Sequence, residues 1–334
     1  MKSFAGKVIQ GGMGAAVSSW RLANAVSRLG QLGVVSGTGL EQFLARVLQN
    51  GDEGGHVRRA LSHFPFPRMA QRILEKYFVP GGRSPDTPYR SVPMHTMEGR
   101  REPHEMCIAA NFVEVFLARE GHSNPVGINF LEKIQMPHLP SLYGAMLAGV
   151  AVVIMGAGIP VEIPGVLDGL AKHQSVRYPL YVNGALRGET YRLNFAPASF
   201  LEQPAAEVPI ERPQFLAIIA SETLATMLCR RANGKVDGFV IEGPLAGGHN
   251  APPRGPLQLT DDGQPIYGPR DSVDLAVIRK LGLPFWLAGC YGSPEKVQEA
   301  LAAGAAGVQV GTAFALCSDS GLTPEFRHTL IRKA

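Results

Sequence analysis

The feature that most limits the possible folds of this chain is a repeated pattern: a short apolar run, a turn with glycine or polar residues, and an amphipathic stretch. Uninterrupted apolar runs are typical of strands buried on both faces of a parallel sheet, and the amphipathic stretches between them are typical of helices. Eight such units can be counted. The expected strands are residues 7–12, 32–36, 125–130, 150–155, 214–220, 237–242, 284–287 and 307–310.

Eight β-α units predict an α/β fold, a (β/α)8 TIM barrel, with residues 1–334 as one domain. A doubly wound open sheet is the alternative, because the pattern does not reveal whether the sheet closes. Both folds bind ligands at the carboxyl ends of the strands. The first helix is expected to open with a Ser18-Ser19 cap. The expected helices are residues 18–29, 40–49, 139–148, 163–172, 222–231, 272–281, 293–303 and a last one from 324.

Two long stretches interrupt the repeat, after the second and the fourth β-α units. Residues 50–105 contain proline-rich loops and an amphipathic segment at 68–78, and a helix at 104–119 then leads to the third strand. Residues 175–212 contain an alternating segment at 178–184 that indicates a hairpin. Both stretches are long for plain loops, so we expect them to be lids or decorations of the barrel.

Composition excludes several classes of protein. The net charge is only +4 over 334 residues, and no run of lysine and arginine is long enough for nucleic acid or a membrane surface. The four cysteines are widely spaced, without a C-x-x-C pair or a histidine at metal-ligand spacing, so neither a disulfide framework nor a metal site is expected. No secretory signal and no membrane-spanning apolar stretch is found, which predicts a cytoplasmic protein.

The loop after the first expected strand is rich in glycine: Gly11, Gly12 and Gly14 surround Met13. Glycines allow the backbone to lie flat against a planar group, and the polarizable methionine can cover it. A simple tight turn would account for the glycines equally well. The third strand ends near Asn129, whose amide can donate to and accept from the polar edge of a ring, although a helix cap is an equal alternative.

The sixth strand is followed by Gly247, Gly248 and His249. A lone histidine is usually structural, but this one follows two glycines at the expected active-site face. Because the imidazole titrates near neutral pH, it is suited to taking a proton from a carbon acid. His249 is therefore the best catalytic candidate. Arg254 could hold an anionic substrate, although a plain surface arginine is the commoner case.

The loops after the last two strands carry a predicted phosphate site. Barrels often hold a phosphate between these loops. No Walker motif occurs and no G-x-G-x-x-G follows a strand, which disfavours a nucleoside triphosphate or a dinucleotide. Backbone N–H groups and a hydroxyl would act as donors. The residues in question are Ala288, Gly289, Cys290, Gly292, Gly311 and Thr312.

Taken in order, these motifs resemble those of the nitronate monooxygenase (2-nitropropane dioxygenase) family. The resemblance runs from about residue 7 to 316. Any single motif is weak evidence for the family, but the set of motifs in this order is specific. It is nearest to a longer-insert branch that carries Gly248-His-Asn-Ala-Pro-Pro-Arg254. The motifs are Ile9-Gln-Gly-Gly-Met-Gly14, Leu32-Gly-Val-Val-Ser-Gly-Thr38, Gly127-Ile-Asn129, Ala246-Gly-Gly-His249 and Gly304-Ala-Ala-Gly-Val-Gln-Val-Gly-Thr312.

The resemblance implies an FMN-dependent oxidoreductase. Gly11 to Gly14 would lie near the isoalloxazine ring, Asn129 would reach the ring or the ribityl chain, and Gly289 to Gly292 with Gly311-Thr312 would hold the phosphate. A nitronate, or a nitroalkane first deprotonated by His249, would pass an electron to FMN, and O2 would complete the conversion to a carbonyl compound and nitrite. The alternatives are an FMN-dependent enoyl-thioester (enoyl-ACP) reductase using NAD(P)H and a non-catalytic barrel that binds phosphate or flavin. The physiological substrate, and whether the chain is a homodimer, stay open.

Three departures from the family pattern matter. Cys290 stands where the family more often has glycine, which predicts a negative φ at this position. The Asn-Ala-Pro-Pro-Arg segment after His249 differs from shorter members and leaves substrate specificity open. The sequence stops at Lys333-Ala334 within an expected helix, and members of this branch are often longer, so we expect the native chain to continue.

Overall fold

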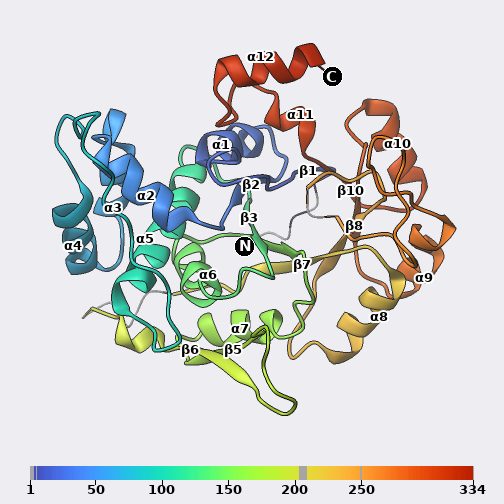
Figure 1. The fold of residues 1–334 in the computed structure, drawn as a ribbon, viewed down its shortest axis with the longest axis horizontal. Helices are drawn as coiled ribbons and strands as arrows, with labels where there is room; N and C mark the ends of the chain where they lie inside the picture. Colours follow the sequence, from blue (N-terminus) through green and yellow to red (C-terminus); the bar gives the residue numbers. More distant parts are fainter. Residues whose placement is uncertain (1–3, 5, 203–208, 249, 334) are drawn as a thin grey trace.

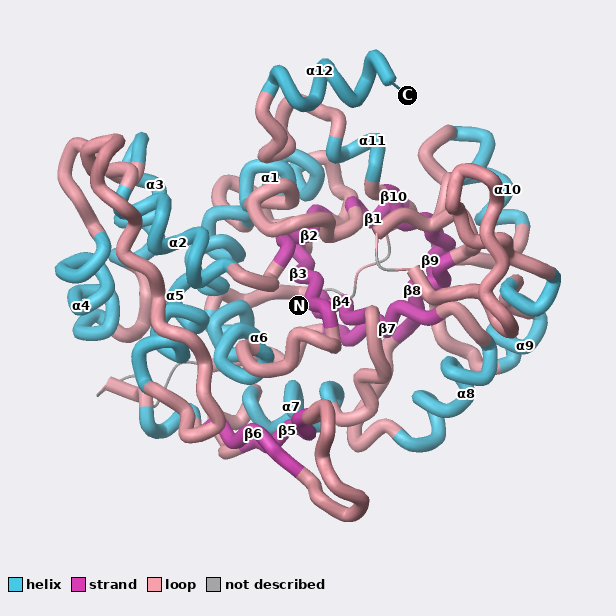
Figure 2. Tube along the Cα trace, in the orientation of Figure 1, coloured by secondary structure: helices cyan, strands magenta, loops and turns pink. Residues whose placement is uncertain are grey.

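A closed ring of eight parallel strands forms the centre of the computed structural model, which describes residues 4, 6–202, 209–248 and 250–333 (Figures 1 and 2). The ladder runs in the order β1-β10-β9-β8-β7-β4-β3-β2. The bounds are β1 Val8–Gln10, β2 Gly33–Ser36, β3 Val126–Leu131, β4 Val152–Gly156, β7 Gln214–Ile219, β8 Gly238–Glu242, β9 Phe285–Ala288 and β10 Gly307–Val310.

The ring closes between β1 and the residue that precedes β2. Ile9 and Leu32 form a parallel bridge. The N–H of Gln10 donates to the carbonyl of Leu32 at 2.9 Å, and the N–H of Leu32 donates to the carbonyl of Val8 at 3.1 Å. A sheet whose two end strands bond to each other is a barrel. The predicted TIM barrel is therefore confirmed, and the open sheet is excluded.

Helices surround the ring in the expected alternation (Figure 1). The predicted helices at residues 40–49 and 222–231 match α2 and α8 at both ends, and the others agree within a few residues. The bounds are α1 Trp20–Arg28, α2 Leu40–Gln49, α5 Arg101–Ala118, α6 His138–Leu147, α7 Ile163–Leu170, α8 Glu222–Arg231, α9 Leu275–Lys280, α10 Pro294–Ala302, α11 Thr312–Ala315 and α12 Pro324–Lys333.

The two insertions lie where the repeat was interrupted. The first contains the 3-10 turn Glu53–Gly55, α3 His56–Ser62 and α4 Pro67–Tyr77, followed by an extended loop that reaches α5. The second contains an antiparallel hairpin of β5 Val176–Leu180 and β6 Tyr191–Phe195, outside the ring (Figure 2). The alternation at 178–184 coincided with a strand only at 178–180, because β5 ends at Leu180 and the connection to β6 runs over residues 181–190.

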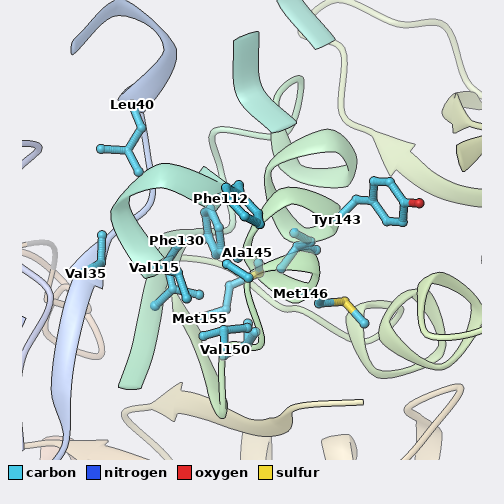
Figure 3. Packing of buried hydrophobic residues seen from close by; sticks show 14 of the residues in the cluster. Val35, Leu40, Phe112, Val115, Phe130, Tyr143, Ala145, Met146, Val150 and Met155 are labelled. Atoms are coloured by element: carbon cyan, nitrogen blue, oxygen red, sulfur yellow. The ribbon is translucent and has the colours of Figure 1, made fainter. Parts of the chain in front are cut away.

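Two apolar layers hold the barrel together. One fills the ring with side chains that alternate along the strands, among them Ile9, Val34, Ile154, Val240 and Trp286. The other lies between the strands and the helices. Figure 3 shows part of it, with side chains of α5 and α6 packed against Phe130 and Met155. Alternation along a strand therefore decides which residues point into the ring and which point outward.

The start of α1 differs from its prediction. Ser19 occupies the N-cap position but makes no capping hydrogen bond. The N–H of Trp20 instead donates to Oε2 of Glu114, a buried carboxylate on α5, at 2.7 Å. Burial raises the pKa of Glu114 to about 7. The hydroxyl of the neighbouring Ser18 is directed to the loop after β1 and is not available to the helix.

Candidate active site

Three polar side chains point into the mouth of the barrel at the carboxyl ends of the strands. Asn129 lies two residues after Gly127, whose Cα hydrogens face Val34 and Leu32 within the ring. Glu242 lies two residues after the inward-facing Val240. Gln309 is paired with the inward-facing Ile9. Because side chains alternate along strands, all three face the interior. Sequence reasoning selected Asn129 and missed the other two, although alternation from apolar neighbours could have found them.

The glycine loop after β1 is fixed by buried hydrogen bonds. Nε2 of Gln10 donates to the carbonyl of Gly11 at 2.7 Å and to Oγ of Ser18 at 3.1 Å. The Ser18 hydroxyl also accepts the N–H of Met13 at 3.0 Å. From the next strand, Oγ of Ser36 donates to the carbonyl of Met13 at 3.0 Å. The loop therefore has one defined path across the mouth, as a preformed ligand platform requires.

Gly12 brings this loop against Asn129. A Cβ built on Gly12 would lie 2.4 Å from the Cβ of Asn129, so only glycine fits. Asn129 is 8% exposed, and its side chain lies against Gly12. Oε1 of Gln309 is buried without a partner among the described residues. A buried polar atom is normally paired, so the Gln309 oxygen, together with the polar amide of Asn129, fits a ligand with a polar edge, such as the flavin ring that the resemblance implies.

The loops after β9 and β10 lie next to each other. A Cβ on Gly292 would be 3.6 Å from Cγ1 of Val310 and 4.0 Å from Cβ of Ala313. Within the described part of the chain, the backbone N–H groups of Cys290, Tyr291 and Gly292 donate to no acceptor. Clustered free N–H groups are the donors that bind phosphate. Met13 reaches this region from the other side, since a Cβ on Gly311 would be 4.0 Å from its Cγ.

The backbone at Cys290 contradicts the expectation of a negative φ. Its φ is +60°, in the left-handed region, and the preceding Gly289 has a φ of +105°. Gly289 cannot carry a side chain, because a Cβ there would approach the backbone nitrogen of Ala246 to 3.0 Å. The chain turns sharply away from β9 at these two residues, and Cys290 takes a conformation that disfavours a side chain.

A cavity of about 650 Å³ opens beside this mouth, over the carboxyl ends of β7 and β8. Its lining includes the cationic side chains of Lys133 and Arg254 and the carboxyl group of Glu242. Burial raises the pKa of Glu242 to about 7. The guanidinium of Arg254 donates to the carbonyls of Arg270 and Ala220, at 2.7 and 2.9 Å, which fixes its position at the rim.

The predicted catalytic residue, His249, lies outside the described residues. Its neighbours Gly248 and Asn250 both line the cavity. Nδ2 of Asn250 donates to the carbonyls of Gly243 and Pro244, each at 3.1 Å, which ties the loop back to the end of β8. Gly247 belongs to the same loop, and a Cβ there would meet no atom of the described residues within 4 Å. Ala288 is buried at the end of β9.

Together the fold and the mouth define a TIM barrel with a candidate ligand site at the carboxyl ends of its strands. The family model described as nitronate monooxygenase matches residues 189–334. The resemblance seen in the motifs is therefore confirmed over this part of the chain, and so is the predicted class of enzyme, an oxidoreductase. The matched part contains the loops after β8, β9 and β10, whereas Gly11 to Gly14 and Asn129 lie outside it.

Three solved structures are similar over almost the whole chain. FabK from Thermotoga maritima is 17% identical, with 98% of this chain and 65% of that chain covered and a TM-score of 0.49. A nitroalkane oxidase from Streptomyces ansochromogenes is 16% identical, with coverages of 97% and 70% and a TM-score of 0.48. The enoyl reductase domain of MlnA from Bacillus amyloliquefaciens is 11% identical, with coverages of 97% and 57% and a TM-score of 0.45. No curated protein matches in sequence.

No helix among the described residues is both long and apolar enough to cross a membrane.

Proposed function

We propose that this chain oxidises nitronates with a bound FMN and O2, releasing a carbonyl compound and nitrite. The proposal depends most on one observation: the glycine loop after β1 and the unpaired Oε1 of Gln309 lie at the same barrel mouth as a cavity lined by two cations and the half-buried carboxyl group of Glu242. A planar cofactor and an anionic substrate would each find suitable contacts there. The family match over residues 189–334 supports the same class of reaction.

The residues present fit FMN in three respects. Gly11, Gly12 and Met13 would lie along the ring, and Asn129 would reach its polar edge or the ribityl chain. Gln309, with its buried unpaired oxygen, adds a second polar contact at this level. The phosphate would lie on the loops 289–292 and 311–312, whose backbone supplies N–H donors. When bound, the flavin supplies one-electron oxidation of the nitronate, with O2 as the final acceptor.

The protein itself would bind the substrate and move one proton. Lys133 and Arg254 would attract the nitronate oxygens through their positive charge. For a neutral nitroalkane, the imidazole of His249 would take the proton from the carbon next to the nitro group and so form the nitronate in place. Glu242, with its pKa of about 7, would be partly protonated at neutral pH and is a second group that could hold that proton.

The test is an anaerobic absorbance titration of the purified protein with a nitronate in one sample and NADPH in another. If the nitronate bleaches a flavin spectrum, the proposed activity is supported. If only NADPH bleaches it, the chain is better described as an enoyl-thioester reductase. If no flavin band forms even after FMN is added, the assignment of the cofactor is wrong and a non-catalytic phosphate-binding barrel becomes the better description.

A further inference from the structure

Three potential metal ligands that are not among the residues of the proposed flavin site form a cluster. Glu41 comes from the first turn of α2, His95 from the loop before α5, and Cys107 from α5. One ligand atom from each of the three lies within 4.8 Å of the other two. The Cys107 Sγ and His95 Nε2 atoms are 3.5 Å apart. The three residues are far apart in the sequence, so no spacing motif could have revealed them.

Burial makes this cluster unusual. Cys107 is fully buried and Glu41 is 8% exposed. Oε2 of Glu41 and Nδ1 of His95 are buried atoms that find no hydrogen-bond partner in the described part of the chain. An unpaired buried carboxylate oxygen is destabilising unless another group compensates it. Oε2 of Glu41 is therefore available to a ligand that is not a protein group.

A nucleophilic site and a disulfide both fit the cluster less well than a metal ion does. A nucleophilic cysteine needs access for its substrate, whereas Cys107 is fully buried. A disulfide is also excluded in this structure, because all four cysteines are free. The cluster contains one thiol, one imidazole and one carboxylate. These are the types of group that bind zinc in proteins.

We propose that Glu41, His95 and Cys107 bind a zinc ion through a carboxylate oxygen, an imidazole nitrogen and the sulfur. Zinc bonds of about 2.0–2.3 Å place tetrahedral ligand atoms about 3.3–3.8 Å apart. The present separations therefore need only small side-chain adjustments. The buried Ser141, whose hydroxyl faces Cys107, or a water molecule would complete the tetrahedron.

The ion would connect two helices to the long loop of the first insertion. At present Gln42 holds this loop to α2 by donating from Nε2 to the carbonyl of Val92 at 3.1 Å. A zinc ion would add a bond from His95 in the same loop to both α2 and α5. His95 is half-buried, so an ion can reach it from solvent. The imidazole ring of His104, centred 5.8 Å from that of His95, lines a cavity of about 650 Å³. The role would be structural.

The test measures zinc binding directly, without any enzyme assay. The full chain is stripped with a chelator, incubated with zinc chloride, passed through a desalting column and analysed for metal. A parallel sample receives Co²⁺, whose absorption spectrum shows a charge-transfer band when a thiolate is bound. The variants are Cys107→Ser and His95→Gln, and Cys229→Ser, which changes an exposed cysteine on α8, is the matched control.

We expect about one zinc per chain and a thiolate–Co²⁺ band in the parent protein and in Cys229→Ser. Both should be lost in Cys107→Ser. In His95→Gln the zinc content should fall at least tenfold. Zinc should also raise the thermal midpoint of the parent protein. The proposal is overturned if the parent retains no more zinc than Cys107→Ser, or if the band persists without Cys107.

A misfolded Cys107→Ser protein would make that comparison ambiguous, so a second measurement uses the parent chain alone. Alkylation of Cys107 in mild urea, followed by peptide mass analysis, should slow at least several-fold when zinc is present, while alkylation of Cys229 should not change. Equal protection of both cysteines, or of neither, contradicts a site at Cys107.

Discussion

Gly12 lies so close to Asn129 that a Cβ atom on residue 12 would come within 2.4 Å of the Asn129 Cβ. The atom in the way belongs to a barrel strand and cannot move aside as the end of a flexible side chain could. The contact therefore fixes the distance between the loop after β1 and the amide of Asn129. Gly12 and Asn129 are both expected to contact the same flat ligand, and they can lie this close because residue 12 has no Cβ atom.

The first prediction follows from that contact. Gly12→Ala should lower the free energy of unfolding by about 1–3 kcal/mol, because overpacking displaces backbone, and it should weaken flavin binding at least tenfold. Gly268→Ala is the matched control, since nothing lies within 4 Å of a Cβ at that position and its φ is −121°. Urea unfolding and a flavin fluorescence titration give the two quantities. Equal values for the two variants would show that the loop can shift freely.

A second prediction concerns the pH dependence of stability. Burial raises the pKa of Glu242 to about 7 in the folded chain, from the ordinary 4.5. The folded state therefore holds this proton more tightly than the unfolded state does. This contribution to stability is fully present below about pH 4.5 and is lost as the pH rises through about 7.

Glu242→Gln should remove the loss of stability above about pH 4.5, because the glutamine amide stays neutral at every pH in this range. At pH 8 the variant should be more stable than the parent by on the order of 2 kcal/mol, and near pH 4 the two should agree. Urea unfolding across this pH range measures the difference. Glu75→Gln, which changes an exposed carboxyl group on α4, should leave the pH profile of the parent unchanged.

The third prediction tests the left-handed backbone at Cys290. Cys290→Gly should raise the free energy of unfolding by about 0.5–1 kcal/mol, because glycine adopts a φ of +60° without strain. Glycine also makes the unfolded chain more flexible, which cancels only part of this stabilisation. Cys290→Ala keeps the Cβ atom and should show no such gain. If both variants behaved alike, the thiol rather than the backbone would account for the change.

The fourth prediction concerns the start of α1. Glu114→Ala should destabilise the fold by about 1–3 kcal/mol, because the N–H of Trp20 loses its acceptor within a buried site. Ser19→Ala should change stability little, since the Ser19 side chain makes no capping bond. Thermal unfolding of the two variants decides the matter: a larger loss in Ser19→Ala would restore the serine as the cap.

The fifth prediction tests the chemistry. His249→Ala should keep the flavin but lose at least a hundredfold in turnover of a neutral nitroalkane, while a preformed nitronate still reacts in part. Steady-state oxygen consumption with each substrate gives the comparison, and the flavin content of the purified variant is the control. Equal rates for variant and parent would remove His249 from the proton transfer and direct attention to Glu242.

The order of strands and helices could be predicted because each element carries its own periodicity, and closure of the ring could be expected from the count of units. What could not be predicted depends on contacts between distant parts of the chain. The acceptor for Trp20 comes from α5, not from the neighbouring serine. The positive φ of Cys290 occurs at a turn where Gly289 lies close to Ala246, which is more than 40 residues away in the sequence. The cluster of Glu41, His95 and Cys107 exists only once α2 and α5 are packed.

During synthesis, β1 cannot pair with its neighbour β10 until residues 307–310 have been added to the chain. Val8 takes its register from Val308, and the N–H of Gly11 finds its acceptor on Val310. Before those residues leave the ribosome, β1 can bond only near Leu32, and the growing sheet keeps an exposed edge of the kind that pairs with other chains. The loop with Gly12 therefore takes its final position late in folding, so binding of a flat ligand would report that β10 has joined the barrel.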